Sequence, residues 1–169
     1  TTHALEYALE EVKLKPGDNI VTTDAEYDSL YVVLSNLHVV KKAQIQIADI
    51  LSTIETSNFA DNAIETIAAK VNKKTKAVVL SDILRSCGIV LPVKEITQAC
   101  KEQNPEAVVI VDGAQSFGHI PVDMSEYGCD AYATCGHKWI GSPTGVGMLF
   151  AKDGFIDPRS RAFLEYMQT

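Results

Sequence analysis

The stretch VIVDGAQ at residues 109–115 decides the fold of this chain, together with TCGHKW at residues 134–139. In each stretch a short apolar run stops abruptly at polar residues. An apolar run of this length is typical of a buried parallel strand. Because ligands of open α/β sheets bind at the carboxyl ends of the strands, we expect Asp112 and Lys138 to lie at the same edge of one sheet.

Strand and helix patterns alternate along the rest of the chain, which predicts an α/β fold with a mainly parallel sheet. The expected strands cover residues 20–23, 44–47, 77–80, 108–111, 130–135 and 146–151. The expected helices cover residues 1–12, 25–39, 61–71 and 92–103, with Asp61 capping the third. We expect a loop over residues 48–60, a connector at residues 121–123, and a C-terminal helix within residues 155–169.

Length and charge limit the classes of function. A chain of 169 residues predicts about one domain. The net charge is −7 and Lys and Arg do not cluster, which argues against a nucleic-acid partner. No apolar run approaches the roughly 20 residues of a membrane helix, so we expect no membrane span.

The four cysteines form no Cys-x-x-Cys pair and have no zinc-like spacing with the four histidines. We therefore expect no metal site and a reduced, cytoplasmic setting. The sequence shows neither a signal peptide nor an initiating Met and opens inside a helix start. For this reason we expect residues 1–169 to be a piece of a longer protein.

An Asp and a Lys in one crevice fit the chemistry of pyridoxal phosphate. The lysine forms a Schiff base with the cofactor aldehyde, and the aspartate keeps the pyridinium nitrogen protonated so that the ring takes up electrons. The spacing of Asp112 and Lys138 also fits a simpler arrangement, with a strand-end aspartate acting as a cap and a lysine on the surface.

Three motifs carry a resemblance to a known family: DGAQ at 112–115, GHKW at 136–139 and PTGVG at 143–147. Together they resemble the class V aminotransferases, which include cysteine desulfurases, selenocysteine lyases, kynureninases and isopenicillin N epimerase-like enzymes. The resemblance covers nearly the whole chain. It implies part of the three-layer large domain of a fold-type I enzyme, without its N-terminal segment and its C-terminal small domain. It also implies a homodimer.

The resemblance assigns cofactor contacts to several residues. It implies that Lys138 binds pyridoxal phosphate covalently, that Asp112 pairs with the ring nitrogen, and that Gln115 contacts the ring hydroxyl. It implies a ring in stacking contact with the cofactor at Tyr27. It implies phosphate contacts at Thr1 and Thr2, and His137, adjacent to Lys138, suits a further phosphate contact because its imidazole N–H groups can donate.

Several of these residues also have a purely structural interpretation. A threonine at the start of a helix is a good N-cap, although a helix N-terminus also holds phosphate. Tyr27 fits an ordinary half-buried aromatic residue, and Gln115 fits a hydrogen bond within its loop. We expect His3 to lie on a helix surface and His119 to be structural.

The sequence departs from the family pattern at three positions. Family members commonly carry His where Asp82 stands, desulfurases carry Asn where Arg85 stands, and desulfurases commonly carry Ser where Cys135 stands. None of the four cysteines matches the desulfurase nucleophile. Arg85 fits either a bidentate contact to a substrate carboxylate or a surface salt bridge. By resemblance, Thr144 helps to bind phosphate across a dimer interface.

The sequence therefore predicts a pyridoxal-phosphate-dependent enzyme that acts on an amino acid, in the epimerase or lyase branch of the family. A cysteine desulfurase or selenocysteine lyase is the first alternative, and a non-catalytic α/β binding module is the second. A dinucleotide-binding domain is disfavoured, because GVG at residues 145–147 has no third glycine or helix start at the required spacing.

Overall fold

The computed structural model describes residues 1–159 and contains a six-stranded sheet in the order β2-β1-β3-β4-β5-β6. Five strands run parallel, and β6 is antiparallel to β5. This arrangement confirms the expected α/β fold with a mainly parallel sheet. The strands are β1 (Asn19–Thr23), β2 (Gln44–Ala48), β3 (Thr75–Ser81), β4 (Val108–Asp112), β5 (Ala131–Cys135) and β6 (Gly147–Ala151).

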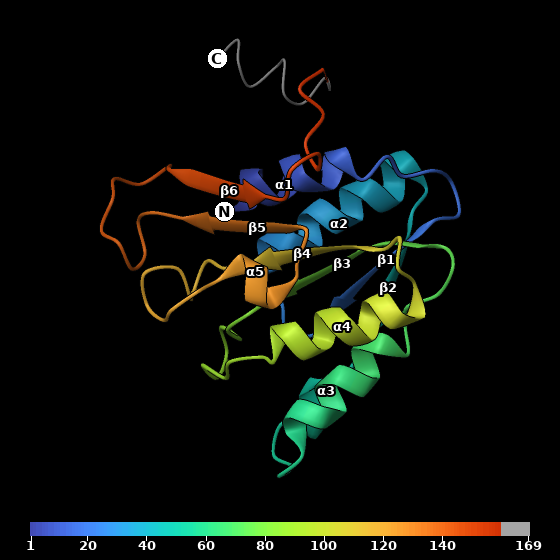
Figure 1. Ribbon diagram of the computed structural model, residues 1–169, viewed down its shortest axis with the longest axis horizontal. Helices are drawn as coiled ribbons and strands as arrows, with labels where there is room; N and C mark the ends of the chain where they lie inside the picture. Colours follow the sequence, from blue (N-terminus) through green and yellow to red (C-terminus); the bar gives the residue numbers. More distant parts are fainter. Residues whose placement is uncertain (160–169) are drawn as a thin grey trace.

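Helices cover both faces of the sheet and make three layers (Figure 1). One face packs against α1 (Thr2–Glu11) and α2 (Asp28–Lys41). The other packs against α3 (Phe59–Ala68), α4 (Val93–Gln103) and the short α5 (Met124–Tyr127). In α1 the buried residues Leu5, Ala8 and Leu9 recur at the spacing of one helix face, so the helix lies flat on the sheet.

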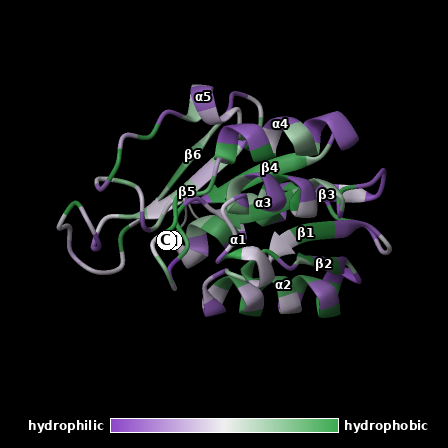
Figure 2. Ribbon diagram, turned by 90° about the horizontal axis from the view of Figure 1, so that it is seen from below, coloured by the Kyte–Doolittle hydropathy of each residue, from purple (hydrophilic) through white to green (hydrophobic). Residues whose placement is uncertain are grey.

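The central strands are buried on both faces, as the apolar runs in the sequence predict. Ala77, Val78, Val79 and Leu80 of β3 have no exposed surface. Figure 2 shows the central strands coloured largely as hydrophobic between helices of mixed hydrophilic and hydrophobic colour. The apolar surface that this arrangement removes from water stabilises the sheet by roughly 25 cal/mol per Å².

Several element boundaries differ from the sequence-based expectation. Helix α3 begins at Phe59 rather than after Asp61, because the Phe59 side chain is buried in the core and brings the chain into the helix earlier. The expected loop at 48–60 contains a 3₁₀ helix, Leu51–Thr53. Residues 155–159 form bends and turns, and the rest of the expected C-terminal helix lies outside the described residues.

Helix α5 was not predicted and depends on its caps. The Asp123 carboxylate accepts hydrogen bonds from the backbone and side chain of Ser125, and Gly128 ends the helix at a φ of 68°. Such a short helix has too few residues to produce a periodic apolar pattern, so its caps are its only sequence signal.

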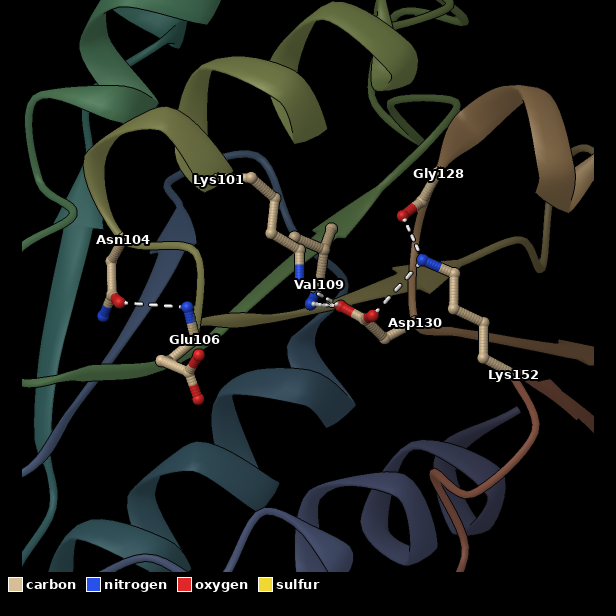
Figure 3. A network of polar contacts seen from close by, with 7 residues as sticks. All are labelled: Lys101, Asn104, Glu106, Val109, Gly128, Asp130 and Lys152. Atoms are coloured by element: carbon tan, nitrogen blue, oxygen red, sulfur yellow. Dashed lines mark hydrogen bonds and ion pairs between the residues drawn. The ribbon is translucent and has the colours of Figure 1, made fainter.

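A polar network fixes the amino ends of β4 and β5 (Figure 3). Asp130 accepts hydrogen bonds from Lys101 Nζ at 2.7 Å and from the Val109 N–H at 2.8 Å. Lys152 Nζ donates to the Gly128 carbonyl at 2.8 Å. The network sets β4, β5 and α4 relative to one another at the edge of the sheet opposite the predicted site.

No helix within residues 1–159 is both long enough and apolar enough to cross a membrane. Within the same span, no group of three or more His, Cys, Asp or Glu side chains is arranged to hold a metal ion.

Candidate active site

A pocket of about 210 Å³ opens at the carboxyl ends of the parallel strands. Every cofactor-binding residue expected from the sequence lines it: Thr1, Thr2, Tyr27, Asp112, Gln115, His137 and Lys138. The lining also includes Ser29, Ser81, Ile83, Arg85, Ala114 and Cys135. The exposed Thr144 is not among the lining residues.

The parallel topology explains why these residues meet. Asp112 ends β4, and Lys138 follows the end of the neighbouring strand β5. Tyr27 is the N-cap of α2, after the short turn that follows β1, and Thr1 is the N-cap of α1. Parallel strands place all their carboxyl ends at one edge, so residues that follow different strands converge there.

Asp112 is the buried acid of the pocket, with only 6% of its surface exposed. Its Oδ1 accepts a hydrogen bond from the Ala114 N–H at 2.9 Å. Burial raises the pKa of Asp112, while the Ala114 hydrogen bond and the positive charge of Lys138 oppose that rise. A buried carboxylate gains most from a cationic partner, which a protonated pyridine nitrogen supplies.

Lys138 is exposed to the pocket, and its Nζ lies 5.5 Å from the centroid of the Tyr27 ring. The following residue fixes the loop that carries it. The Trp139 indole N–H donates to Gln115 Oε1 at 3.3 Å, and the His119 ring stacks on Trp139 with centroids 3.9 Å apart. Gln115 and His119 therefore hold the Lys138 loop against the loop that follows β4.

One of the residues expected to bind phosphate, Thr1, has a buried hydroxyl without a hydrogen-bond partner. Thr1 Oγ1 is buried and has no hydrogen-bond partner, whereas Thr2 Oγ1 donates to Ser29 Oγ at 3.0 Å. Buried polar groups nearly always have a partner, so an orphan hydroxyl that lines a pocket fits a missing acceptor. His137 is exposed on the same pocket and adds ring N–H groups that suit an anion.

Sequence analysis gave no role to a second buried acid, Glu26. Its carboxylate accepts from Thr23 Oγ1 at 2.6 Å, and from the Ser81 N–H at 2.9 Å and Ser81 Oγ at 2.6 Å. Burial raises the pKa of Glu26 to about 7 against these hydrogen bonds. The signal for this residue was a charged side chain three residues after the end of the buried strand β1.

A third buried acid, Asp82, lies in a cluster behind Asp112. Ser116 Oγ donates to Asp82 Oδ2 and is also hydrogen-bonded to the Tyr132 hydroxyl at 2.6 Å. The other oxygen, Oδ1, is buried without a partner. Burial, helped by the negative charge of Asp112, raises the pKa of Asp82 to about 6. The structure places Asp82 in this cluster, outside the residues that line the pocket.

The comparisons with known proteins agree with this geometry. The model of the family described as "Aminotransferase class-V" matches residues 1–160. A probable cysteine desulfurase of Halalkalibacterium halodurans is 32% identical over 85% of this chain and 33% of its own length. The isopenicillin N epimerase of Amycolatopsis lactamdurans is 32% identical over 83% of this chain and 34% of its own length. The chain thus spans about a third of these relatives.

Solved structures of C-DES share the fold. The complex of the cystine C-S lyase C-DES with its product, cysteine persulfide, has a TM-score of 0.84 and 31% identity over 93% of this chain and 42% of that one. A C-DES mutant with glycine covalently linked to its PLP cofactor has a TM-score of 0.82 and 30% identity over 90% and 39% of the two chains. From the family match over residues 1–160 and these likenesses, we conclude that this chain belongs to the aminotransferase class V family of pyridoxal-phosphate-dependent proteins.

Proposed function

We propose that this chain forms the cofactor-binding part of a pyridoxal-phosphate-dependent enzyme that acts on an amino acid, in the epimerase or lyase branch of the family. One observation carries the proposal. The buried Asp112 and the pocket-facing Lys138, from the ends of two adjacent strands, line the same small pocket.

The pocket residues fit this cofactor by their chemistry. Thr1 with its unpartnered hydroxyl, Thr2 and His137 would hold the phosphate group, which accepts several hydrogen bonds. The Asp112 carboxylate would face the ring nitrogen, Gln115 the ring hydroxyl, and Tyr27 the plane of the ring.

When bound, pyridoxal phosphate supplies an electron sink for carbanion chemistry at an amino-acid α-carbon. The Asp112 carboxylate would keep a proton at the ring nitrogen, and its burial keeps competing water away from it. Lys138 would hold the cofactor covalently, and its Nζ, once released as a free amine, would take up and return the proton at the substrate α-carbon. Trp139, Gln115 and His119 orient Lys138 by fixing its loop.

The relatives support the choice of branch. C-DES is described as a cystine C-S lyase, and another relative is an epimerase. The similar probable cysteine desulfurase keeps desulfurisation as a second candidate. Product analysis separates them: full-length protein incubated with L-cysteine yields alanine and bound sulfur in a desulfurase, and neither product in an epimerase.

We further propose that the full-length protein is a homodimer with the pocket near the interface. Trp139, Ile140 and Val146, in the segment that follows Lys138, expose between 43% and 48% of their surface. Exposed apolar side chains within one short segment favour association. Analytical ultracentrifugation of the full-length protein tests this point.

Covalent labelling tests the proposed function directly. Full-length protein is incubated with pyridoxal phosphate, reduced with borohydride and digested, and the modified peptide is identified by mass spectrometry. We expect the label on the peptide that contains Lys138, with a visible absorbance band before reduction. A non-catalytic binding module would carry no stoichiometric label, and label on a different lysine would contradict the assignment.

A further inference from the structure

One cation of the pocket, Arg85, has no role in holding the cofactor. Asp112, Lys138, His137 and the threonines are accounted for by the proposed function, whereas Arg85 lines the same pocket from a different loop. Its Cζ lies 4.8 Å from the centroid of the Tyr27 ring, so Arg85 and Lys138 both lie against that ring. Arg85 therefore lines the pocket in which a substrate would reach Lys138.

The loop that carries Arg85 is tightly fixed. The Leu84 carbonyl accepts from the N–H groups of Cys87 and Gly88, and the Leu84 N–H donates to Ile89. The Leu91 N–H donates to the Asp82 carbonyl at 2.8 Å, and the Leu84 side chain is fully buried. Arg85 thus extends from a preorganised turn, so binding a ligand requires little ordering of the backbone.

The guanidinium group of Arg85 has free hydrogen-bonding capacity. Among the residues the structure describes, its polar contact is with Asp28, at 3.9 Å, where the side chains are 51% and 85% exposed. A pair so long and so exposed contributes little and leaves the planar donor fork open. Such a fork matches a carboxylate with two parallel N–H···O hydrogen bonds.

We propose that Arg85 is a specificity-determining residue that binds a carboxylate of the amino-acid substrate. The proposal rests on the function proposed above, because it takes Lys138 as the place where the substrate reacts. Arg85 selects for a substrate that has a carboxylate beside the Tyr27 ring, in reach of the guanidinium group, when the substrate reaches Lys138. Two sources share this chemistry: the α-carboxylate of any amino acid, and a second carboxylate on its side chain.

Binding measurements on the full-length, cofactor-loaded protein separate the two sources. The probes are L-alanine, L-glutamine and L-glutamate, of which the last two differ by a single distal charge. Dissociation constants are measured by calorimetry for the wild type, Arg85→Gln, Arg85→Lys and the control Arg159→Gln. Arg159 pairs with Asp157 and does not line the pocket. Arg159→Gln therefore removes one positive charge, as Arg85→Gln does, but at a position outside the pocket.

We expect Arg85→Gln to weaken binding by about 10- to 100-fold, because hydrogen bonds to charged groups contribute that much to affinity. Weakening of all three probes assigns Arg85 to the α-carboxylate, and weakening of L-glutamate alone assigns it to the side-chain carboxylate. Arg85→Lys should recover part of the loss, since it keeps the charge without the fork, and Arg159→Gln should bind like the wild type.

Three results overturn the proposal: Arg85→Gln binds every probe within twofold of the wild type, the wild type binds none of them, or Arg159→Gln loses as much as Arg85→Gln. The visible absorbance of each variant is recorded first. A wild type that never attaches the cofactor contradicts the proposed function itself. An Arg85→Gln variant that loses the cofactor places Arg85 on the cofactor and contradicts only the substrate role.

Discussion

The amine of Lys138 lies 5.5 Å from the centroid of the Tyr27 ring. This contact connects the loop after β5, which carries Lys138, to the start of α2, where Tyr27 lies. A cation at this distance from an aromatic ring is held by the negative face of the ring. Tyr27 thus keeps the amine in the pocket near the buried carboxylate of Asp112, and the predicted effects of substitution at these positions follow from that geometry.

Replacing Lys138 by Ala should abolish covalent attachment of pyridoxal phosphate. Lys138 is the one lysine among the described residues that line the pocket, so no second lysine side chain there can substitute for it. Borohydride labelling followed by mass spectrometry is the measurement, on full-length protein. Lys94→Ala, at an exposed position of α4, is the control and should label normally. Stoichiometric label in the Lys138→Ala variant would refute the role of Lys138.

Replacing Asp112 by Asn should leave the cofactor bound but reduce turnover strongly. A neutral amide cannot hold the ring nitrogen in its protonated form, so stabilisation of the developing carbanion is lost. The Ala114 N–H can still donate to the amide oxygen, which preserves the local backbone. The comparison is of kcat with the quantity of reductively fixed cofactor. Unchanged kcat in the variant would remove Asp112 from the mechanism.

Replacing Thr1 by Val should weaken cofactor affinity by about 10-fold, because it removes a hydroxyl expected to donate to a charged phosphate. Thr22→Val is a matched control. Thr22 Oγ1 is also buried and unpartnered, yet Thr22 does not line the pocket. Fluorescence titration of the full-length apoprotein with pyridoxal phosphate gives both affinities. An equal loss in the two variants would mean that the Thr1 hydroxyl has no special contact.

Stability should fall as the pH rises from about 4 to 6, because Asp82 must ionise while buried. Its pKa is raised from 3.8 to about 6 in the folded protein, so in this window the folded state holds a proton that the unfolded state has released. A shift of two units corresponds to about 3 kcal/mol. Glu26, with its pKa raised to about 7, acts in the same direction at slightly higher pH.

Asp82→Asn should therefore flatten the decline, since an amide does not titrate and still accepts from Ser116. Urea unfolding of the apoprotein at pH 4, 5, 6 and 7 measures the free energy of unfolding. Asp153→Asn, in the exposed turn after β6, is the control and should keep the wild-type slope. Identical slopes for the wild type and Asp82→Asn would show that Asp82 stays ionised when folded.

Replacing Gly113 by Ala should destabilise the protein by about 1–3 kcal/mol or more. A Cβ at Gly113 would lie 1.9 Å from Cζ of Tyr132, whose ring is fully buried and whose hydroxyl is held by Ser116. Gly147→Ala is the control, because its nearest neighbour would be an ordinary contact at 3.7 Å. Thermal unfolding compares the two, and equal midpoints would indicate that the Tyr132 ring moves aside.

The sequence by itself determined the α/β class, the positions of most strands, and the two strand-end motifs around Asp112 and Lys138. These features are local: an apolar run predicts a buried strand, and its abrupt stop marks the edge of the sheet. The resemblance added Thr1, Thr2, Tyr27 and Gln115, the position of His137 beside Lys138 added that residue, and the structure places all of them on one pocket. Their individual contacts with a cofactor stay predictions.

Only the tertiary structure decided which distant polar groups meet. Glu26 bonds to Ser81 across 55 residues of sequence, and Ser116 bonds to Asp82 across 34. Such contacts depend on the strand order β2-β1-β3-β4, which no local periodicity encodes. Likewise, a hydrogen-bonded turn brings Arg85 over the start of α2 and against the Tyr27 ring. The sequence left two interpretations of Arg85 open, a carboxylate contact and a surface salt bridge. Only the folded chain shows that its ion pair with Asp28 is long and exposed.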